Sequence, residues 1–458
     1  MSELNPQRNP AQERLQANDK LKAVGGLSML SKSLGTQLQL KNLRYFGSEK
    51  DTDVENREDF LGGEEFKEAR TEMKDKLNTL IELLEKGTDV SKNADSQKMK
   101  IEAEMSEKMS KIFEKSRPLE KAWRELDLFF TNAAQRELRN LVVMNVNHDQ
   151  VDESVVTKKV SDMLEEVNKS AIDQSKSYSM LVIPYNTTKK KNFDKWRKLI
   201  ERYSDIAYNN KVLFMTDYED LATVDDVMEA ATDPDKPRLG GVNKSWSRTV
   251  VYTNYALMRD KHKLGSNVLE KEMLYASPAA AVAGKMYAID NIAQPIAGAQ
   301  FGVLKGLQGL RYKVSQEQAN VLDRENLNPM TNAFGGLMAF NCVTMFKGEN
   351  VELRQYSVIR TLDYIDRLLK HFLNQYVFTS MQDSDIRAHV HKTIMKMLER
   401  LVELKILKKG GIQHFSIDED RPDRFNIKLE VVPMYVTSAF EYTIGIDPNG
   451  VSEGEGND

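Results

Sequence analysis

The sequence has a single cysteine, Cys342, among 458 residues. One thiol cannot form an internal disulfide, so a disulfide framework is excluded and a reducing compartment is favoured. The chain also lacks a long apolar run, because its least polar stretch, residues 274–304, is interrupted by Lys285, Asp290 and Pro295. That stretch falls short of the roughly 20 apolar residues of a membrane span, and the polar N-terminus lacks a secretory signal. We expect a cytoplasmic protein without direct membrane insertion.

Charge of one sign is not in excess, since 65 lysines and arginines face 69 aspartates and glutamates. Nucleic acid and anionic membranes select a concentrated basic face, so we expect neither as a partner. The two ends differ from the rest. Residues 1–50 hold eight basic and four acidic residues, and residues 447–458 are acidic without a base. We interpret residues 1–60 as an extended N-terminal arm and residues 447–458 as an acidic mobile tail.

Two apolar islands in the arm, Leu27–Leu30 and Leu38–Phe46, leave two interpretations open. In an assembly they could add a strand to the sheet edge of a neighbouring copy. A flexible tail with incidental apolar residues explains them equally well.

Motifs of known chemistry are absent or lie in the wrong setting. Residues 240–245 approach a phosphate-binding loop but lack its spacing, and a G-x-S-x-G match at 450–454 lies in the acidic tail. His389 and His391 are two residues apart on a predicted helix, so they point in different directions and cannot share a metal ion. We therefore predict no catalytic residue, no cofactor and no metal site, and a protein that is not an enzyme.

Hydrophobic periodicity predicts helices over Glu64–Lys86 and about Asn93–Lys115, with a new helix beginning at Pro118. From residue 140 to residue 256, β-rich runs alternate with helical patterns, which predicts βαβ units in a mainly parallel sheet. The runs predicted as strands are 141–146, 179–184, 212–215 and 249–252, and the predicted helices are 155–167, 193–203 and 224–231.

The C-terminal third predicts a mixture of helices and strands. A small-residue helix covers 276–289, Ser315 caps a helix to about Glu325, and 333–346 is paired or bent strand around Gly335–Gly336. Amphipathic helices cover 355–377 and 385–407, the second closed by Gly410–Gly411. A strand pair follows at about 413–417 and 426–446.

One segment carries a family signature. Residues 119–126, LEKAWREL, resemble the L-E-x-x-W-R-x-L segment of the large sheath subunit of type VI secretion systems. The chain has Glu125 where that family usually has glycine, and it is similar to a divergent branch of the Bacteroidota type. The residues that carry this motif are Leu119, Glu120, Trp123, Arg124 and Leu126.

The C-terminal order of elements is similar to that of contractile tail sheaths in general. A turn at Asn328-Pro329 and a glycine-containing strand at 334–340 precede a helix with Arg360, Tyr364 and Ile365. A second helix ending in glycine and a strand with Val432-Pro433-Met434 complete the likeness.

The resemblance implies an α/β fold, α+β overall, in which a βαβ-type sheet is combined with N-terminal helices, a C-terminal mixed domain and extended arms. It divides the chain into an arm at 1–60, a helical region at 61–135 that contacts the small sheath subunit, and an α/β sheath domain at 136–310. A C-terminal sheath domain at 311–446 and the tail at 447–458 follow.

The resemblance also implies the partners. They are the small sheath subunit, neighbouring copies joined by strand exchange, the inner tube protein, a baseplate and an AAA+ disassembly ATPase. The function implied is mechanical: a helical sheath around the inner tube contracts and drives that tube into a target cell.

Sheaths of this family attach to the inner tube through a helix of the C-terminal domain, and 385–407 fits that place in the order. We expect its apolar stripe, which starts at Ile386, to face the subunit core, and its basic excess to meet carboxylates on the tube. A solvated amphipathic helix remains the alternative. The predicted contact residues are Arg387, His391, Lys392, Lys396 and Arg400.

A second function from another class stays open. An α/β enzyme would hold its site at the carboxyl ends of the strands, near Val146, Pro184 and Asp217. The lack of a glycine-rich fingerprint after Val146 disfavours this interpretation.

Overall fold

The computed structural model describes residues 71, 75, 78, 90–134, 140–146, 150–151, 153–170, 177–184, 193–234 and 238–437. The predicted arm, the predicted acidic tail and, apart from positions 71, 75 and 78, the predicted helix Glu64–Lys86 lie outside these residues. The chain divides into two compact units, Met1–Lys111 and Ile112–Asp458. The sheets and hydrophobic cores described below belong to the second unit.

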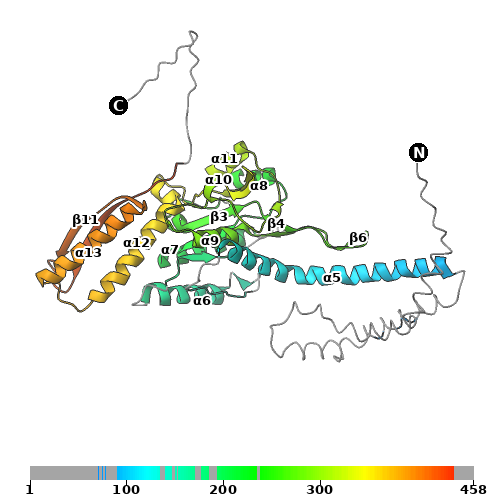
Figure 1. The fold of residues 1–458 in the computed structure, drawn as a ribbon, viewed down its shortest axis with the longest axis horizontal. Coiled ribbons are helices and arrows are strands. Elements are labelled where there is room, and N and C mark those ends of the chain that lie inside the picture. The colour runs from blue at the N-terminus through cyan, green and yellow to red at the C-terminus, as the bar shows by residue number, and fades with distance from the viewer. Residues whose placement is uncertain are drawn as a thin grey trace, which may run out of the picture. The chain divides into compact units, whose positions relative to one another are not determined.

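Helix α5 spans Val90–Asn132 without a break (Figure 1). The predicted end at Lys115 and the predicted new start at Pro118 are therefore wrong, because Pro118 lies inside the helix. A proline in a helix interior removes a backbone hydrogen bond and costs about 3 kcal/mol. Ion pairs on both sides of the proline, described below, hold this stretch of helix in place and offset that cost.

A five-stranded sheet forms the centre of the second unit. Its strand order is β1-β2-β3-β9-β10, in which the first four strands run parallel and β10 pairs antiparallel with β9. The prediction of an α/β fold with a mainly parallel sheet is confirmed. The strands are β1 (Met180–Val182), β2 (Leu213–Asp217), β3 (Thr249–Thr253), β9 (Asn328–Ala333) and β10 (Gly336–Ala339).

One predicted strand is wrong. Residues 141–146 have no regular secondary structure, and Leu141, Val142 and Val143 keep 42, 46 and 59 % of their surface exposed. An apolar run becomes a strand only where a partner strand and a core are available to it. Met144 of this run packs against the core that contains Phe214, but no residue of the run pairs with a strand of the described sheets.

Successive residues of β2 face opposite sides of the sheet. Phe214 packs into one core with helices α6 and α7, whereas Leu213 and Met215 pack into a second core with α9 and with Leu128 of α5. All five residues of β2 are buried, as expected for a strand covered on both faces. The sheet is therefore a layer between helices (Figure 1). These helices are α6 (Ser154–Glu165), α7 (Phe193–Asn210) and α9 (Pro278–Ala288).

Short elements connect these layers. Ser315 caps α11, as the sequence predicts, and the structure adds a reciprocal capping box with Gln318. A three-stranded sheet has the order β7-β4-β8, and β5 pairs with β6 in a separate hairpin. The bounds are α8 (Val224–Thr232), β4 (Ala256–Arg259), β5 (Lys263–Leu264), β6 (Asn267–Val268), β7 (Leu274–Ala276), α10 (Gly298–Phe301), β8 (Gly309–Leu310) and α11 (Gln316–Arg324).

The C-terminal part of the second unit has its own core, formed by two helices and a two-stranded antiparallel hairpin. The predicted glycine closure of the second helix is wrong, because Gly410 lies within strand β11. Lys405 instead adopts a left-handed backbone (φ 55°), and Ile406 N–H closes the helix end on the carbonyl of Leu401. The elements are α12 (Tyr356–Leu373), α13 (Ser384–Glu403), β11 (Leu407–Ile417) and β12 (Phe425–Pro433).

The predicted boundary between residues 310 and 311 lies between strands β3 and β9 of the five-stranded sheet. Strands β9 and β10 lie beyond it in sequence, yet they complete the five-stranded sheet. A βαβ sheet can include strands from segments far apart in the sequence. The pattern of residues within one strand does not show which sheet the strand joins. Among the helices of the described residues, none has an apolar stretch long enough to cross a membrane.

Helix α9 approaches α5 so closely that only glycine fits. A Cβ added to Gly284 would lie 2.1 Å from the carbonyl oxygen of Phe129. We expect Gly284→Ala to lower the free energy of unfolding by about 1–3 kcal/mol, because the two backbones must move apart. Thermal unfolding measures this, with Gly411→Ala as the control, since a Cβ there meets nothing within 4 Å. A Gly284→Ala variant as stable as the parent would contradict this close packing.

Candidate functional site

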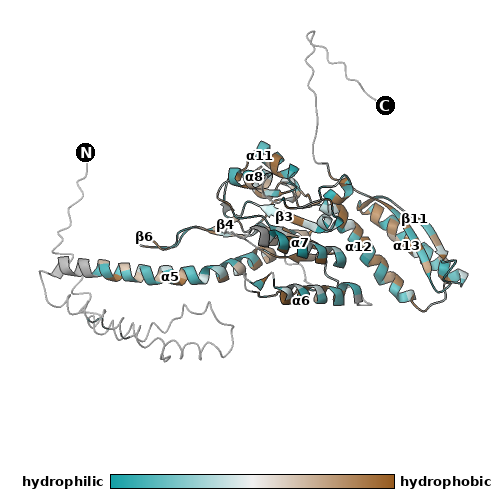
Figure 2. Cartoon of the chain, turned by 180° about the vertical axis from the view of Figure 1, so that it is seen from behind, coloured by the Kyte–Doolittle hydropathy of each residue, from teal (hydrophilic) through white to brown (hydrophobic). Residues whose placement is uncertain are grey.

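The motif helix α5 exposes a line of large apolar side chains. Ile112, Leu119, Trp123 and Phe130 keep 62, 70, 58 and 48 % of their surface exposed. Steps of seven, four and seven residues bring the four to one side of a helix. We call them the apolar ridge, and Figure 2 shows hydrophobic residues at intervals along the otherwise hydrophilic helix. Large apolar side chains left exposed along one side of a helix are typical of a contact site for another protein.

The other side of the motif helix is held by charged side chains. Arg259, the last residue of β4, forms a fork with Glu120, in which Nε donates to Oε1 at 2.8 Å and Nη2 donates to Oε2 at 2.6 Å. Arg124 Nη2 lies 3.6 Å from the same carboxylate. The Arg124 guanidinium also lies 5.2 Å from the centroid of the Trp123 ring, which links this charged side to the apolar ridge.

The motif residues thus divide between two sides of α5. Leu119 and Trp123 belong to the apolar ridge, Glu120 and Arg124 belong to the ion pairs, and Leu126 is half-buried. Sequence reasoning grouped these five residues but missed Arg259. It lies 139 residues from Glu120, and no pattern in the sequence joins the two.

Glu125, at the position where the resembled family usually has glycine, is buried against the start of α9. Its Oε1 accepts a hydrogen bond from the backbone N–H of Ser277 at 3.0 Å. Burial raises the pKa of Glu125, although the charge of Lys121 and this hydrogen bond act in the opposite direction. Near the end of α5, the buried Asn132 side chain exchanges hydrogen bonds of 2.9 and 3.0 Å with the backbone of Lys305. The C-terminal half of α5 is therefore fixed to the sheet layer.

Helix α13 turns its predicted apolar stripe to the core. Val390, Ile394, Leu398 and Leu401 are buried, and Ile386 packs against them. Steps of three and four residues along the sequence are enough to predict this face.

Two of the predicted contact residues lie beside that core face. Arg387 is half-buried, and the ring of His391 packs edge-on against Phe415 of β11, with 5.1 Å between centroids. His389 lies near a different ring, that of Tyr376. Within the described residues, no group of three or more histidine, cysteine, aspartate or glutamate side chains could hold a metal ion.

The other three predicted contact residues point outward from α13. Lys392, Lys396 and Arg400 are exposed, and Arg400 pairs with Glu403 at 2.8 Å on the same helix. His391 is exposed as well, so four of the five predicted residues are exposed and Arg387 is half-buried. The charge of Arg400 is partly neutralised by Glu403.

Of the three residues named for an alternative enzyme site, Asp217 is the one with an ionisable side chain, and it is enclosed. Asp217 ends β2 and is wholly buried, and Val146 is not at the end of a strand. Burial raises the pKa of Asp217 well above its usual range, the Ser277 hydroxyl lowers it, and the negative charge of Glu125 raises it again. A carboxyl group enclosed in this way has no access to a substrate.

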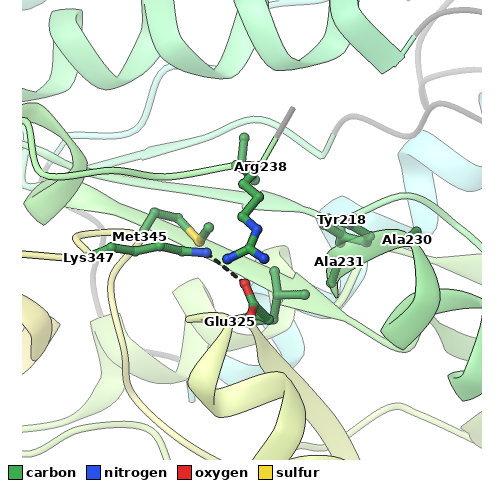
Figure 3. A pocket seen from close by; sticks show the side chains of 9 residues that line it. Tyr218, Ala230, Ala231, Arg238, Glu325, Met345 and Lys347 are labelled. Atoms are coloured by element: carbon green, nitrogen blue, oxygen red, sulfur yellow. Dashed lines mark hydrogen bonds and ion pairs between the residues drawn. The ribbon is translucent and has the colours of Figure 1, made fainter. Parts of the chain in front are cut away.

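A small pocket lies close to the sheet, where Figure 3 shows Arg238 directed towards Glu325. The Lys347 ammonium pairs with the Glu325 carboxylate at 2.8 Å. The cavity has a volume of about 10 Å³, which is about the room that one water molecule needs. Pockets that bind small molecules typically enclose about 300–1,000 Å³, so this one is not a substrate site.

Comparison with protein families gives matches on two successive segments. Residues 111–347 match the family described as type VI secretion system TssC/VipB, central domain. Residues 355–457 match TssC/VipB-like, C-terminal domain. Together the two matches cover well over half of the chain.

Two solved structures share the fold. The helical sheath of the anti-feeding prophage in its contracted state aligns with a TM-score of 0.50 and 15 % identity, over 71 % of this chain and 82 % of that chain. A chain of the anti-feeding prophage baseplate aligns with a TM-score of 0.51 and 16 % identity, over 70 % and 80 %. Among curated proteins, no sequence matches the chain significantly. The structural likeness places the chain in the sheath-like α/β fold.

Proposed function

Because the chain belongs to the TssC/VipB family of type VI secretion system proteins, we propose that it is the large subunit of a contractile sheath. The family and the sheath-like fold indicate a structural role rather than a catalytic one. The subunit pairs with a small sheath subunit, and the pairs polymerise as a helix around an inner tube. Contraction of this cytoplasmic polymer drives the tube into a target cell. A contact between unlike surfaces, repeated by a screw operation, generates such an open helix.

The apolar ridge is the observation that carries the pairing with the small sheath subunit. Its four side chains are 48–70 % exposed, while Glu120 on the flank of α5 binds Arg259 and Asn132 on the opposite side binds the backbone of Lys305. A helix bound on one side and apolar on the other accepts a second amphipathic helix, as helix-in-groove partners do. We assign that partner helix to the small sheath subunit.

Trp123 offers a direct test of this pairing. Of the three tryptophans, Trp196 and Trp246 are buried, at 0 and 7 % exposure, whereas Trp123 is 58 % exposed. Acrylamide therefore quenches mainly Trp123 in the free chain. We expect the small sheath subunit to protect this fluorescence, and Trp123→Phe to remove the protected signal. If quenching is the same with and without the small subunit, the ridge is not its binding site.

Helix α13 is the proposed attachment to the inner tube. We expect reversal of Lys392, Lys396 and Arg400 to glutamate to leave the sheath heterodimer folded but to impair assembly around the tube. Exposed ion pairs contribute only about 0–1 kcal/mol each, so the three act together and still permit release on contraction. Co-sedimentation of sheath with tube protein measures the effect.

A matched control replaces Lys158, Lys159 and Lys169 by glutamate. It changes the net charge by the same amount, but in the region of α6 rather than on α13. The control should assemble normally. Normal sheaths and normal secretion from the α13 variant would mean that α13, or its outward face, is not the attachment.

The C-terminal hairpin is the proposed place of strand exchange. Strands β11 and β12 pair only with each other, so their outer edges have free backbone groups within the described sheet. An arm from a neighbouring copy can add to such an edge through main-chain hydrogen bonds. We also propose that the sheath associates with a baseplate, as the sheath family implies, and that an AAA+ ATPase disassembles the sheath.

A further inference from the structure

Arg259 uses every N–H group that it has. Nε and Nη2 donate to Glu120, while Nη1 and Nη2 donate to Glu270 at 2.5 and 3.0 Å. Nη1 also donates to the carbonyl of Asp260 at 3.0 Å. A guanidinium has five N–H donors in a planar fork, so all five are occupied. One side chain at the end of β4 thus joins helix α5 to the segment that follows the β5–β6 hairpin.

A second arginine repeats the connection on α5. Arg117 Nη1 donates to Glu270 at 3.1 Å and to the carbonyl of Glu272 at 3.2 Å, and Nη2 donates to the carbonyl of Met273. Glu270 also accepts from the backbone N–H of His262 at 2.9 Å. Burial alone would raise the pKa of Glu270, but its hydrogen bonds from Arg259 and His262 lower it to about 2. Glu270 is therefore ionised at neutral pH, and it is shared by two arginines.

These ion pairs bind α5 to the domain in a place where hydrophobic contacts usually bind a helix. A helix packed on a domain normally buries its apolar stripe and exposes its polar face. Between Ile112 and Trp123 the arrangement is inverted, because Leu119 is exposed while Glu120 faces Arg259. The buried anchors of α5 come later, at Leu128 and Asn132. No apolar side chain of Ile112–Trp123 is fully buried, although half-buried Phe113 stacks on His262 with 4.3 Å between ring centroids. The charged hydrogen bonds of Arg259 and Arg117 are therefore the main contacts that fix the orientation of this stretch.

We propose that Arg259 is a positioning residue that clamps Ile112–Trp123 and so presents the apolar ridge to the small sheath subunit in one fixed orientation. The proposal rests on the proposed function, in which the ridge binds that subunit. A preorganised surface binds more tightly because less conformational freedom is lost on association. The planar fork is essential, because a lysine ammonium cannot bind two carboxylates through paired hydrogen bonds.

The test compares Arg259→Gln and Arg259→Lys with the parent as full chains. Hydrogen–deuterium exchange should become about 10-fold faster in residues 112–124 and stay unchanged near Asn132, and the small subunit should bind about 10-fold more weakly. Arg259→Lys keeps the charge, so its exchange and affinity should lie between those of Arg259→Gln and the parent. Lys111→Gln is the matched control, since its pair with Glu107 on the same helix is 67–68 % exposed and should not matter.

Unchanged exchange and affinity in Arg259→Gln would overturn the clamp. So would a loss of the whole fold in both Arg259→Gln and Glu120→Gln, because Glu120→Gln removes only the helix side of the contact. A parent chain that fails to bind the small subunit would count against the proposed function. In that case exchange in residues 112–124 still decides whether Arg259 holds the helix.

Discussion

Replacing Leu119 and Trp123 together by aspartate should abolish the pairing with the small sheath subunit. Both side chains are more than half exposed in the free chain, so the substitutions remove no core contact. In the complex each would place a carboxylate in an apolar interface. Buried aromatic anchors typically contribute about 2 kcal/mol or more, and we expect the affinity to fall at least about 100-fold. Co-purification of the tagged variant with the small subunit, followed by titration, measures the loss.

A matched double variant separates this effect from a general loss of solubility. Val155 on α6 and Val242 are 73 and 75 % exposed, and Val155→Asp with Val242→Asp adds the same two charges away from the ridge. This control should bind like the parent. If the Leu119 and Trp123 variant binds the small subunit as tightly as the parent does, the small subunit contacts another part of the chain.

Asp217→Asn should stabilise the fold at neutral pH. Asp217 is wholly buried, and burial is the main reason for its raised pKa. Glu125 lies close enough to raise it further, and Lys121 lowers it only in part. Asparagine has the same shape without the charge, so we expect a gain of about 1–3 kcal/mol in the free energy of unfolding. Urea unfolding of the heterodimer at pH 8 measures the gain.

The sign of the pH dependence follows from the same shift. An aspartate in the unfolded chain loses its proton near pH 3.9, whereas folded Asp217 retains it to higher pH. Its contribution to stability is therefore present below about pH 4 and is lost as the pH rises towards the folded pKa. Glu125 is shifted in the same direction and adds to this slope. The gain from Asp217→Asn should accordingly be larger at pH 8 than at pH 5.

Asp423→Asn provides the comparison, because Asp423 is an exposed residue of the β11–β12 turn. The free energy of unfolding of Asp423→Asn should match that of the parent at both pH 5 and pH 8. A parent protein that becomes more stable between pH 5 and 8, with Asp217→Asn less stable than the parent at pH 8, would contradict the assignment of a buried acid with a raised pKa.

Local periodicity predicted much of the fold. The apolar stripe of α13 and the helix cap at Ser315 depend on a few neighbouring residues of sequence, and both were found where expected. The strand–helix alternation similarly predicted the mainly parallel sheet. Pro118 misled the helix prediction because tertiary ion pairs keep α5 continuous through a residue that normally begins a helix.

The features that position the candidate site are non-local, and sequence patterns do not carry them. Arg259 meets Glu120 across 139 residues, and Glu125 meets Ser277 across 152. The family motif lies on helix α5, yet it did not reveal which residues of that helix face outward. That division depends on which side of α5 finds partners in the folded domain.

The central claim is that the chain builds a sheath, and electron microscopy of the chain co-expressed with the small sheath subunit tests it most directly. Negative staining should show long helical tubes, and the Leu119 and Trp123 double variant should show none. Parent chain that remains a stable, monodisperse monomer beside the small sheath subunit, without tubes, would contradict the account.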